Sequence, residues 1–217
     1  MHMKRLAMPK TWPLPRKGKK RFVSKGRGSL PLELSLPLTV FLRDILKAVE
    51  TGKEAKKVVK EGNIIVDGRT VKDEKYRVGL FDRIYIKKMD KAFTITIEKK
   101  KLKAVEIGKE SLREKEVKVI GKKTVKGGKI QINLYDGKNL LMEEKEAKNI
   151  KVHDSLLLDL EKNKVVKHLK LEKNAKVFVI KGKHLGEKAK VKEVNKEVVL
   201  TDGKEFKVPK ENVFVIR

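Results

Sequence analysis

Apolar residues recur with the period of an α-helix between positions 38 and 49. They occupy positions 38, 41, 42, 45, 46 and 49, which share one helical face. Ser35 is placed to cap this helix, and Gly52 is expected to end it. A second, shorter helix is predicted for residues 53–61, because Gly62 follows at the position that favours left-handed backbone. The two helices are expected to pack as a hairpin.

The pattern then changes to short apolar runs separated by turn residues. Residues 64–66 and 83–86 are predicted to be strands, and Asp67-Gly68 supplies a hairpin turn after the first of them. Residues 35–91 are therefore expected to form a small helix-helix-sheet domain.

Alternation of apolar and polar residues takes over beyond Ala92. It is clearest in residues 93–97 and 129–134, and Asp136-Gly137 predicts a hairpin after the second of these runs. We expect residues 92–173 to form a β-rich central domain.

Closely spaced short strands are predicted for the last part of the chain, residues 174–217. Asp202-Gly203 again supplies a hairpin turn, and the strands are expected at residues 177–180, 190–194, 197–201 and 205–208. Such spacing is typical of a small barrel. The predicted fold class is therefore α+β, with several domains.

The segment before residue 35 has a different character. Its first acidic residue is Glu33, which follows the basic residues Lys4, Arg5, Lys10, Arg16, Lys17, Lys19, Lys20, Arg21, Lys25 and Arg27. A segment so charged, and interrupted by prolines and glycines, cannot bury enough apolar surface to fold alone. Residues 1–34 are predicted to be a basic extension that becomes ordered on a polyanion.

The charge of the whole chain favours nucleic acid as that polyanion. The 217 residues include 56 Lys plus Arg and 29 Asp plus Glu, a formal charge of +27, and counterion release from RNA or DNA would dominate the affinity of such a protein. A membrane is not an expected partner, because the sequence has no spanning apolar run, amphipathic membrane helix or lipid anchor. Without a signal peptide or any cysteine, a cytoplasmic location is expected.

The most distinctive local motif lies in the basic extension. It reads His2-Met3-Lys4-Arg5-Leu6-Ala7-Met8-Pro9 and is followed by Trp12. Lys4 and Arg5 would bind phosphates, while Trp12 would stack on a base or pack into a groove. A purely solubilising tail is the alternative, but it would leave a tryptophan exposed among charges. RNA contact is the favoured interpretation.

These residues resemble the small-subunit ribosomal proteins of the S4e family, found in archaea and eukaryotes, over essentially the whole chain. A middle stretch is similar to the alpha-L, or S4-like, RNA-binding domain. It runs Leu36-Pro37-Leu38-x-x-Phe41-Leu42-Arg43, then Gly62-Asn63-Ile64-Ile65-Val66-Asp67-Gly68, then Tyr76-Arg77-x-Gly79-x-x-Asp82-x-Ile84. Residues 174–217 resemble a KOW module, an SH3-like barrel, closing on Asn212-Val213-Phe214-Val215-Ile216.

The resemblance implies a set of RNA-binding residues. Basic side chains on the two helices and the turn at residues 67–69 would meet RNA phosphates along one edge and read duplex shape rather than base sequence. For any single lysine, a solvated helix face is the plain alternative. The candidates are Lys4, Arg5, Lys10, Trp12, Arg16, Lys17, Lys19, Lys20, Arg21, Arg43, Lys47, Lys53, Lys56, Lys57, Lys60, Arg69, Lys72, Arg77, Lys181 and Lys183.

The loop of the last module departs from the family pattern. Gly182 and Gly186 fit a KOW loop, in which glycine lets the backbone approach RNA closely. Glu187 and Ala189, however, stand where the family more often has a basic residue and a glycine. A short glycine-containing hairpin is the alternative, so both RNA and protein remain candidate partners of this loop.

Signals for catalysis and metal binding are poor. His2, His153, His168 and His184 are scattered and no cysteine accompanies them. The His153-Asp154 pair lacks a glycine-flanked serine nucleophile, and the spacing of a phosphate-binding loop is missing around Gly127. No enzymatic activity, cofactor, metal or small-molecule substrate is expected.

The expected function is that of a structural constituent of the small ribosomal subunit, located on cytoplasmic ribosomes. Small-subunit ribosomal RNA and neighbouring ribosomal proteins are the expected partners. One alternative is an RNA-modifying enzyme of the pseudouridine-synthase type, although the central region offers no recognisable catalytic motif. The other is a loosely bound translation or transcription factor that uses its KOW module.

Overall fold

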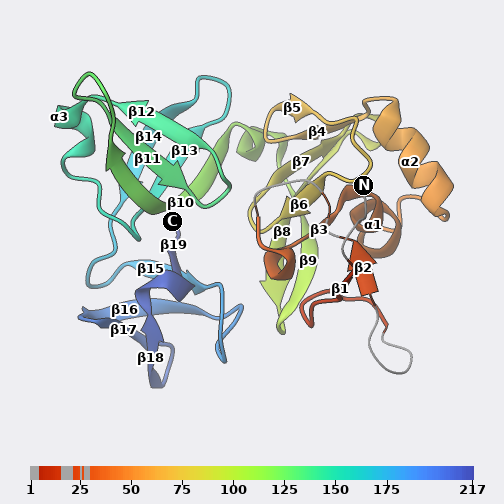
Figure 1. Cartoon of the computed structure of the whole chain (residues 1–217). Helices are drawn as coiled ribbons and strands as arrows, with labels where there is room; N and C mark the ends of the chain where they lie inside the picture. Colours follow the sequence, from red (N-terminus) through yellow and green to blue (C-terminus); the bar gives the residue numbers. More distant parts are fainter. Residues whose placement is uncertain (1–4, 16–21, 25, 27–29) are drawn as a thin grey trace. The chain divides into compact units, whose positions relative to one another are not determined.

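The computed structural model describes residues 5–15, 22–24, 26 and 30–217 (Figure 1). The chain divides into two compact units, Met1–Lys115 and Glu116–Arg217, and antiparallel sheets form most of each (Figure 1). Among the described residues, no helix is both long and apolar enough to cross a bilayer.

The first predicted helix is present in the first unit but is shorter than expected. α1 (Leu38–Val40) continues into η2 (Phe41–Ile45), which has π-helical hydrogen bonds. Leu38, Phe41 and Leu42 are fully buried, so the predicted apolar face does pack inward. The helix ends at Ile45 because Lys47, two residues later, adopts a left-handed φ of 52°.

Neither of the two expected boundary residues of that helix has the predicted role. Ser35 lies in β3 (Ser35–Pro37), which pairs with β6 (Arg77–Gly79), and its hydroxyl donates to the Pro31 carbonyl oxygen at 2.7 Å. Gly52 is the first residue of α2 (Gly52–Lys60), whose N-cap is Thr51. Strand pairing with a segment forty residues away therefore overrides the local capping signal.

The main sheet of the first unit has five antiparallel strands in the order β5-β4-β7-β8-β9. The strands are β4 (Ile64–Val66), β5 (Arg69–Thr70), β7 (Arg83–Ile86), β8 (Lys91–Glu98) and β9 (Lys101–Ile107), with short helices η3 (Lys87–Met89) and η4 (Lys109–Leu112). The expected domain boundary between residues 91 and 92 falls at the start of β8. β8 pairs directly with β7, so residues 92–115 continue the fold of the first unit.

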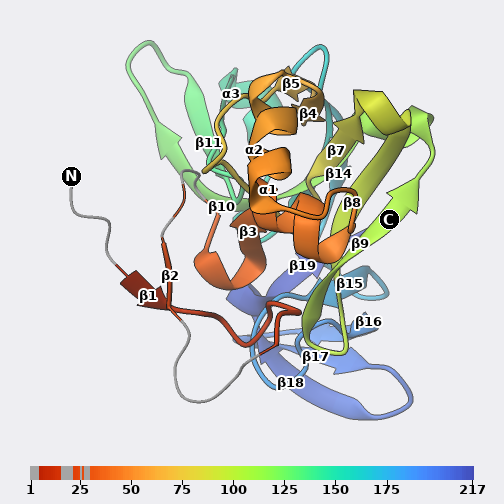
Figure 2. The same cartoon turned by 90° about the vertical axis from the view of Figure 1, so that its right-hand side faces the viewer.

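Part of the basic extension is packed into the first unit. β1 (Arg5–Ala7) pairs with β2 (Phe22–Ser24), a short pair that projects from the main sheet (Figure 2). Trp12 is only 2 % exposed, and its indole Nε1 donates to the Ser35 carbonyl oxygen at 2.9 Å. η1 (Leu32–Leu34) follows. The ring of Trp12, a predicted RNA contact, is therefore buried within the first unit, which leaves its faces covered by protein.

The second unit begins with a five-stranded sheet in the order β12-β11-β10-β13-β14. Its elements are β10 (Glu114–Thr124), β11 (Ile130–Leu134), β12 (Asn139–Met142), α3 (Glu144–Ala147), β13 (Ser155–Asp159) and β14 (Lys164–Leu169). The hairpin predicted at Asp136-Gly137 joins β11 to β12. Val119, Ile132, Leu134 and Leu156 are fully buried in the core of this sheet.

A second sheet in this unit has the order β18-β17-β16-β15-β19. It comprises β15 (Lys176–Val179), β16 (Lys188–Val194), β17 (Glu197–Thr201), β18 (Glu205–Pro209), η5 (Lys210–Asn212) and β19 (Val213–Val215). All four strands predicted for residues 174–217 are present, and Asp202-Gly203 turns between β17 and β18. A core rich in valine holds this sheet together.

Candidate nucleic-acid interface

Helix α2 begins with a capping box. The Thr51 hydroxyl accepts a hydrogen bond from the Glu54 backbone N–H at 3.2 Å, and Glu54 Oε2 accepts from the Thr51 backbone N–H at 3.4 Å. These two bonds satisfy backbone donors that the first turn leaves without intrahelical partners. The cap therefore sets where the helix starts and which side chains share its outer face.

The outer face of α2 is a row of lysines. Ala55 and Val59, one turn apart, are fully buried, so the opposite face points to solvent. Its exposed cations are Lys53, Lys56, Lys57 and Lys60. Residues three or four apart on a helix are neighbours, so these like charges repel one another. Of these four lysines, only Lys56 has a carboxylate within ion-pair distance among the described residues. Its Nζ lies 3.6 Å from Glu74 Oε1.

Arg43 lies beside the start of this basic face. A Cβ on Gly52 would be 3.3 Å from Arg43 Nη1, so the glycine allows the guanidinium to approach the first turn of α2. Arg43 is partly neutralised, because its Nη2 lies 2.7 Å from Asp44 Oδ2, and this hydrogen bond raises the pKa of the guanidinium. Lys47, another predicted site residue, is exposed.

The other end of α2 adjoins β5 and the residues that follow it. A Cβ on Gly62 would lie 3.2 Å from Lys72 Cε and 3.3 Å from Thr70 Cγ2. Lys72 is exposed, as is Arg69 on β5. The structure thus places Arg43 and Lys72 beside the two ends of the helix that bears the α2 lysines.

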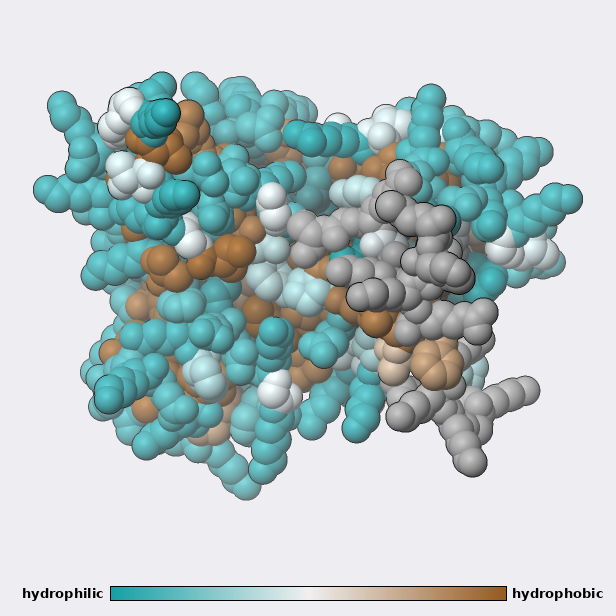
Figure 3. Space-filling view, in the orientation of Figure 1, coloured by the Kyte–Doolittle hydropathy of each residue, from teal (hydrophilic) through white to brown (hydrophobic). Residues whose placement is uncertain are grey.

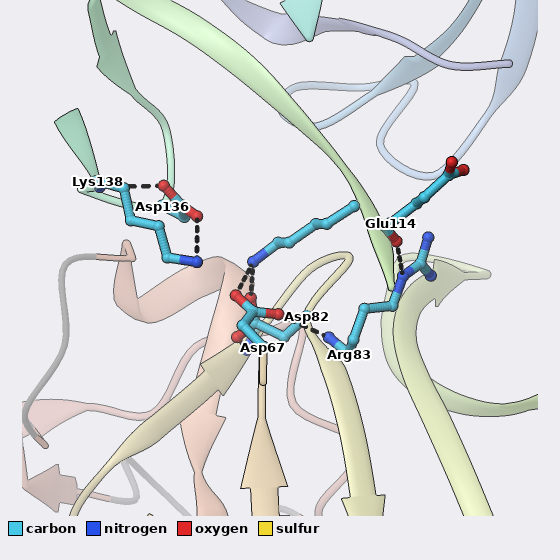
Figure 4. A network of polar contacts seen from close by, with 8 residues as sticks. Asp67, Asp82, Arg83, Glu114, Asp136 and Lys138 are labelled. Atoms are coloured by element: carbon cyan, nitrogen blue, oxygen red, sulfur yellow. Dashed lines mark hydrogen bonds and ion pairs between the residues drawn. The ribbon is translucent and has the colours of Figure 1, made fainter. Parts of the chain in front are cut away.

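A buried ionic cluster supports the turn that precedes Arg69. Lys115 Nζ lies 2.5 Å from Asp67 Oδ2 and 2.6 Å from Asp82 Oδ1 (Figure 4). Asp67 Oδ1 also accepts from the Arg83 backbone N–H at 3.0 Å. Burial raises the pKa of Asp82 to about 6, and Lys115 opposes that rise by favouring the carboxylate. Sequence reasoning missed Lys115 because its partners are distant along the chain.

Arg77 does not belong to the interface. Its side chain is 3 % exposed and donates from Nη2 to the Leu30 carbonyl oxygen at 2.5 Å. Desolvation lowers its pKa. The prediction that Arg77 contacts RNA is therefore wrong, because pairing of β6 with β3 places this side chain inside the first unit.

The structure describes only part of the predicted site in the basic extension. The side chain of Arg5 and the whole of Lys4, Arg16, Lys17, Lys19, Lys20 and Arg21 lie outside the described residues. Lys10 is exposed, and its carbonyl oxygen accepts from Lys101 Nζ at 2.6 Å. Its backbone is thus held against the β8–β9 hairpin while its side chain remains accessible.

Lys181 and Lys183 are exposed in the loop between β15 and β16 of the second unit. Gly182 and Gly186 have left-handed φ values of 91° and 90°, which glycine adopts without strain. The two glycines therefore shape this loop.

Sequence reasoning missed the contacts that hold this loop. The His184 ring stacks on Phe206 with ring centroids 4.0 Å apart, and His184 Nδ1 lies 2.7 Å from Glu187 Oε2. Glu187 thus has an internal partner at the position where a basic residue was expected. No spacing signal links His184 with Phe206, since Phe206 lies on another hairpin.

Hydrophilic residues cover most of the face seen in Figure 3, and apolar side chains show only in smaller patches. The S4 domain model matches residues 36–84, and the model described as ribosomal family S4e matches residues 89–165. The first match contains α2 and its lysines.

Curated relatives and one solved structure extend the similarity over almost the whole chain. The small ribosomal subunit protein eS4 of Methanocaldococcus jannaschii is 35 % identical, covering 99 % of this chain and 93 % of the relative. The protein of the same name from Archaeoglobus fulgidus is 39 % identical, covering 88 % and 79 %. The crystal structure of 30S ribosomal protein S4e from Thermoplasma acidophilum matches with a TM-score of 0.73 at 26 % identity, covering 84 % and 95 %. The chain therefore belongs to the ribosomal S4e family.

Proposed function

We propose that this protein is a structural constituent of the small ribosomal subunit and binds small-subunit ribosomal RNA through the outer face of α2. The single observation that carries the RNA contact is the row of four exposed lysines on a capped helix. Their charges repel one another, and among the described residues only Lys56 has a carboxylate within ion-pair distance. RNA phosphates would supply the missing negative charge.

The proposed contact reads shape rather than sequence. The deep, narrow major groove of an RNA duplex admits side chains poorly, so flexible lysines would follow the phosphate backbone. Arg69 and Lys72 would extend the contact beyond the end of α2. Catalysis has no part in this proposal, and the relatives, which are named as ribosomal subunit proteins, favour it over an RNA-modifying enzyme.

We further propose a role for each of the remaining parts of the chain. Residues 1–34 would contribute further RNA contacts, and residues 174–217 would form a KOW-type, SH3-like barrel whose Lys181 and Lys183 meet RNA or a neighbouring ribosomal protein. The alpha-L part would extend from residue 35 to Lys115. The β-rich centre would follow it and extend to residue 173. The proposed location is the cytoplasmic ribosome.

The first test is sedimentation of cell lysate through a high-salt sucrose gradient. Stoichiometric migration with small subunits supports an integral ribosomal protein. Migration as free protein, or in trace amounts with subunits, would overturn the proposal and favour the loosely bound factor or the enzyme.

A second test isolates the helix face. Lys57→Gln with Lys60→Gln should weaken binding of the full chain to a small-subunit rRNA transcript and lower the salt slope, −dlogK/dlog[salt], by roughly 1.5, since each phosphate contact contributes ~0.7–0.9. The matched control is Lys99→Gln with Lys100→Gln, two exposed lysines on the β8–β9 turn of the same unit. An equal loss in both pairs would mean that only net charge matters.

A further inference from the structure

A hollow of about 530 Å³ lies on the C-terminal sheet, away from α2 in the sequence and in the other unit. Strands β15 and β16 and the β17–β18 turn form its walls. The lining side chains that bear on its chemistry are Lys176, Lys188, Lys190, Thr201, Asp202 and Arg217. Lys176 begins β15, at the end opposite to the loop of residues 181–187.

Strand register brings three of these cations to one face. Lys176 is the direct cross-strand partner of Lys190 in the β15–β16 pair. Along β16, Lys188 and Lys190 are exposed, whereas Ala189 and Val191 are buried. Alternate residues of a strand share a face, so the three ammonium groups lie on the same side of the sheet.

This arrangement is unfavourable unless an anion is present. Like charges directly opposite each other destabilise an antiparallel pair. No carboxylate of the described chain lies within ion-pair distance of Lys176, Lys188 or Lys190. The next outward residue of the same strand, Lys192, does have a partner, with Nζ 2.5 Å from Glu205 Oε1. The hollow thus holds three neighbouring lysines without a carboxylate partner among the described residues, whereas the next lysine along β16 has one.

The remaining polar groups leave the hollow cationic. Asp202 is the one carboxylate side chain of its described lining. Arg217 pairs with Glu116, its Nε lying 3.2 Å from Oε1. Thr201 stands directly opposite Lys190 and brings a hydroxyl that is able to donate a hydrogen bond. A Cβ on Gly203 would meet no atom within 4 Å, so the β17–β18 turn leaves space for a ligand.

We propose that this hollow binds phosphate groups of the RNA backbone, as a contact separate from α2 and from the loop of residues 181–187. This inference rests on the proposed function, because it takes RNA to be the bound polyanion. Lysine is a compact point charge suited to phosphate. An acidic protein segment is the less suitable occupant, because protein interfaces rely on aromatic and apolar anchors. No large apolar side chain of the described lining is exposed.

The first test compares two triple variants of the full chain. Replacing Lys176, Lys188 and Lys190 by Gln should lower the salt slope for an rRNA transcript by roughly 2.4, at ~0.7–0.9 for each of three phosphate contacts. The control replaces Lys192 on β16 and Lys196 and Lys204 in the turns on either side of β17, three exposed lysines outside the hollow. A slope lowered only in the first variant supports the proposal. Equal slopes in both variants overturn it.

A second test maps proximity and uses the absence of cysteine from the chain. A Thr201→Cys variant carrying an iron–EDTA probe should cleave the RNA backbone in the assembled complex, and the same probe on Lys53→Cys reports on α2. If only the probe at position 53 cleaves the RNA, the proposed phosphate site in the hollow is overturned and the proposed α2 contact stands. Cleavage from position 201 alone overturns the α2 contact instead. Cleavage of a neighbouring protein from position 201, without RNA cleavage, would overturn the proposed phosphate site in favour of an acidic protein partner.

Discussion

Lys115 Nζ lies 2.6 Å from Asp82 Oδ1, and both side chains are buried. The same ammonium contacts Asp67, the first residue of the turn that presents Arg69. One cation at the end of the first unit thus ties together two segments that carry the alpha-L pattern. A single substitution should reveal how much this arrangement contributes.

Lys115→Met should destabilise the first unit by about 3–5 kcal/mol. The substitution removes the cation and leaves two carboxylates buried side by side, and a broken buried ion pair typically costs that much. Urea unfolding monitored by circular dichroism measures the change. The control is Lys103→Met, whose lysine forms an exposed pair with Glu98 and should cost no more than ~1 kcal/mol. A loss below 1 kcal/mol for Lys115→Met would contradict the cluster's role.

Asp82 should make the stability of the first unit depend on pH. Its pKa is raised in the folded state from 3.8 to about 6 by burial, so the folded protein holds a proton that the unfolded chain releases. The bound proton therefore stabilises the folded state. This stabilisation is fully present below about pH 4 and is lost as the pH rises through about 6. At ~1.36 kcal/mol per pKa unit, it has a ceiling of roughly 3 kcal/mol.

The measurement is urea unfolding at several pH values between 4 and 7, for the native chain and for Asp82→Asn. Asparagine cannot titrate, so this part of the slope should disappear in the variant. Identical pH profiles in the two proteins would show that Asp82 titrates near its ordinary pKa. The shared titrations of other groups cancel in the comparison.

Lys118 should be essential to the second unit. Its Nζ donates to the carbonyl oxygens of Lys210, Glu211 and Val213 at 2.9, 2.7 and 2.6 Å. Burial lowers the pKa of this lysine to about 7. Lys118→Met would leave three carbonyl groups without their donor, at a cost of about 2–4 kcal/mol, since each unsatisfied buried group costs ~1–3 kcal/mol and the site relaxes in part.

The matched control for that variant is Lys123→Met, because Lys123 lies on the same strand and is exposed. It should change the free energy of unfolding by less than ~0.5 kcal/mol. Thermal and urea unfolding distinguish the two variants. Similar stabilities would rule out a structural role for the three hydrogen bonds.

Trp12 provides a prediction that needs no mutation, because it is the only tryptophan of the chain. Its burial and its hydrogen bond to Ser35 predict blue-shifted emission that moves to longer wavelength only on unfolding. Addition of an rRNA transcript should leave the emission essentially unchanged. Strong quenching at saturating RNA would contradict this prediction, because it would mean that the indole leaves its buried position and stacks on a base.

The elements that local pattern predicted well are those whose signals lie within a few residues. α2 differs from its predicted range by one residue at each end, and β7 matches its range of residues 83–86. The turns at Asp136-Gly137 and Asp202-Gly203 both join strands as expected. The lysine row on α2 could be predicted because helical periodicity alone decides which residues share a face.

Long-range contacts explain the errors. Ser35 has a good local capping signal, yet it pairs with Gly79 in a strand. The boundary expected at residue 92 lies at the start of β8, which pairs with β7 and continues its sheet. Arg77 and Trp12 look like RNA ligands in a basic sequence, but both are buried against segments distant along the chain.

Charge, the basic extension, the helical lysine row and the hairpin turns follow from the amino-acid sequence, because each depends on composition or on neighbouring residues. The tertiary structure decided which cations remain free for a partner. Lys115 and Lys118 are buried against partners up to ninety-five positions away, whereas Lys176 and Lys190 meet across a strand pair without compensation. Burial and strand register depend on residues far apart in the chain, so local periodicity cannot predict which lysines are buried or paired.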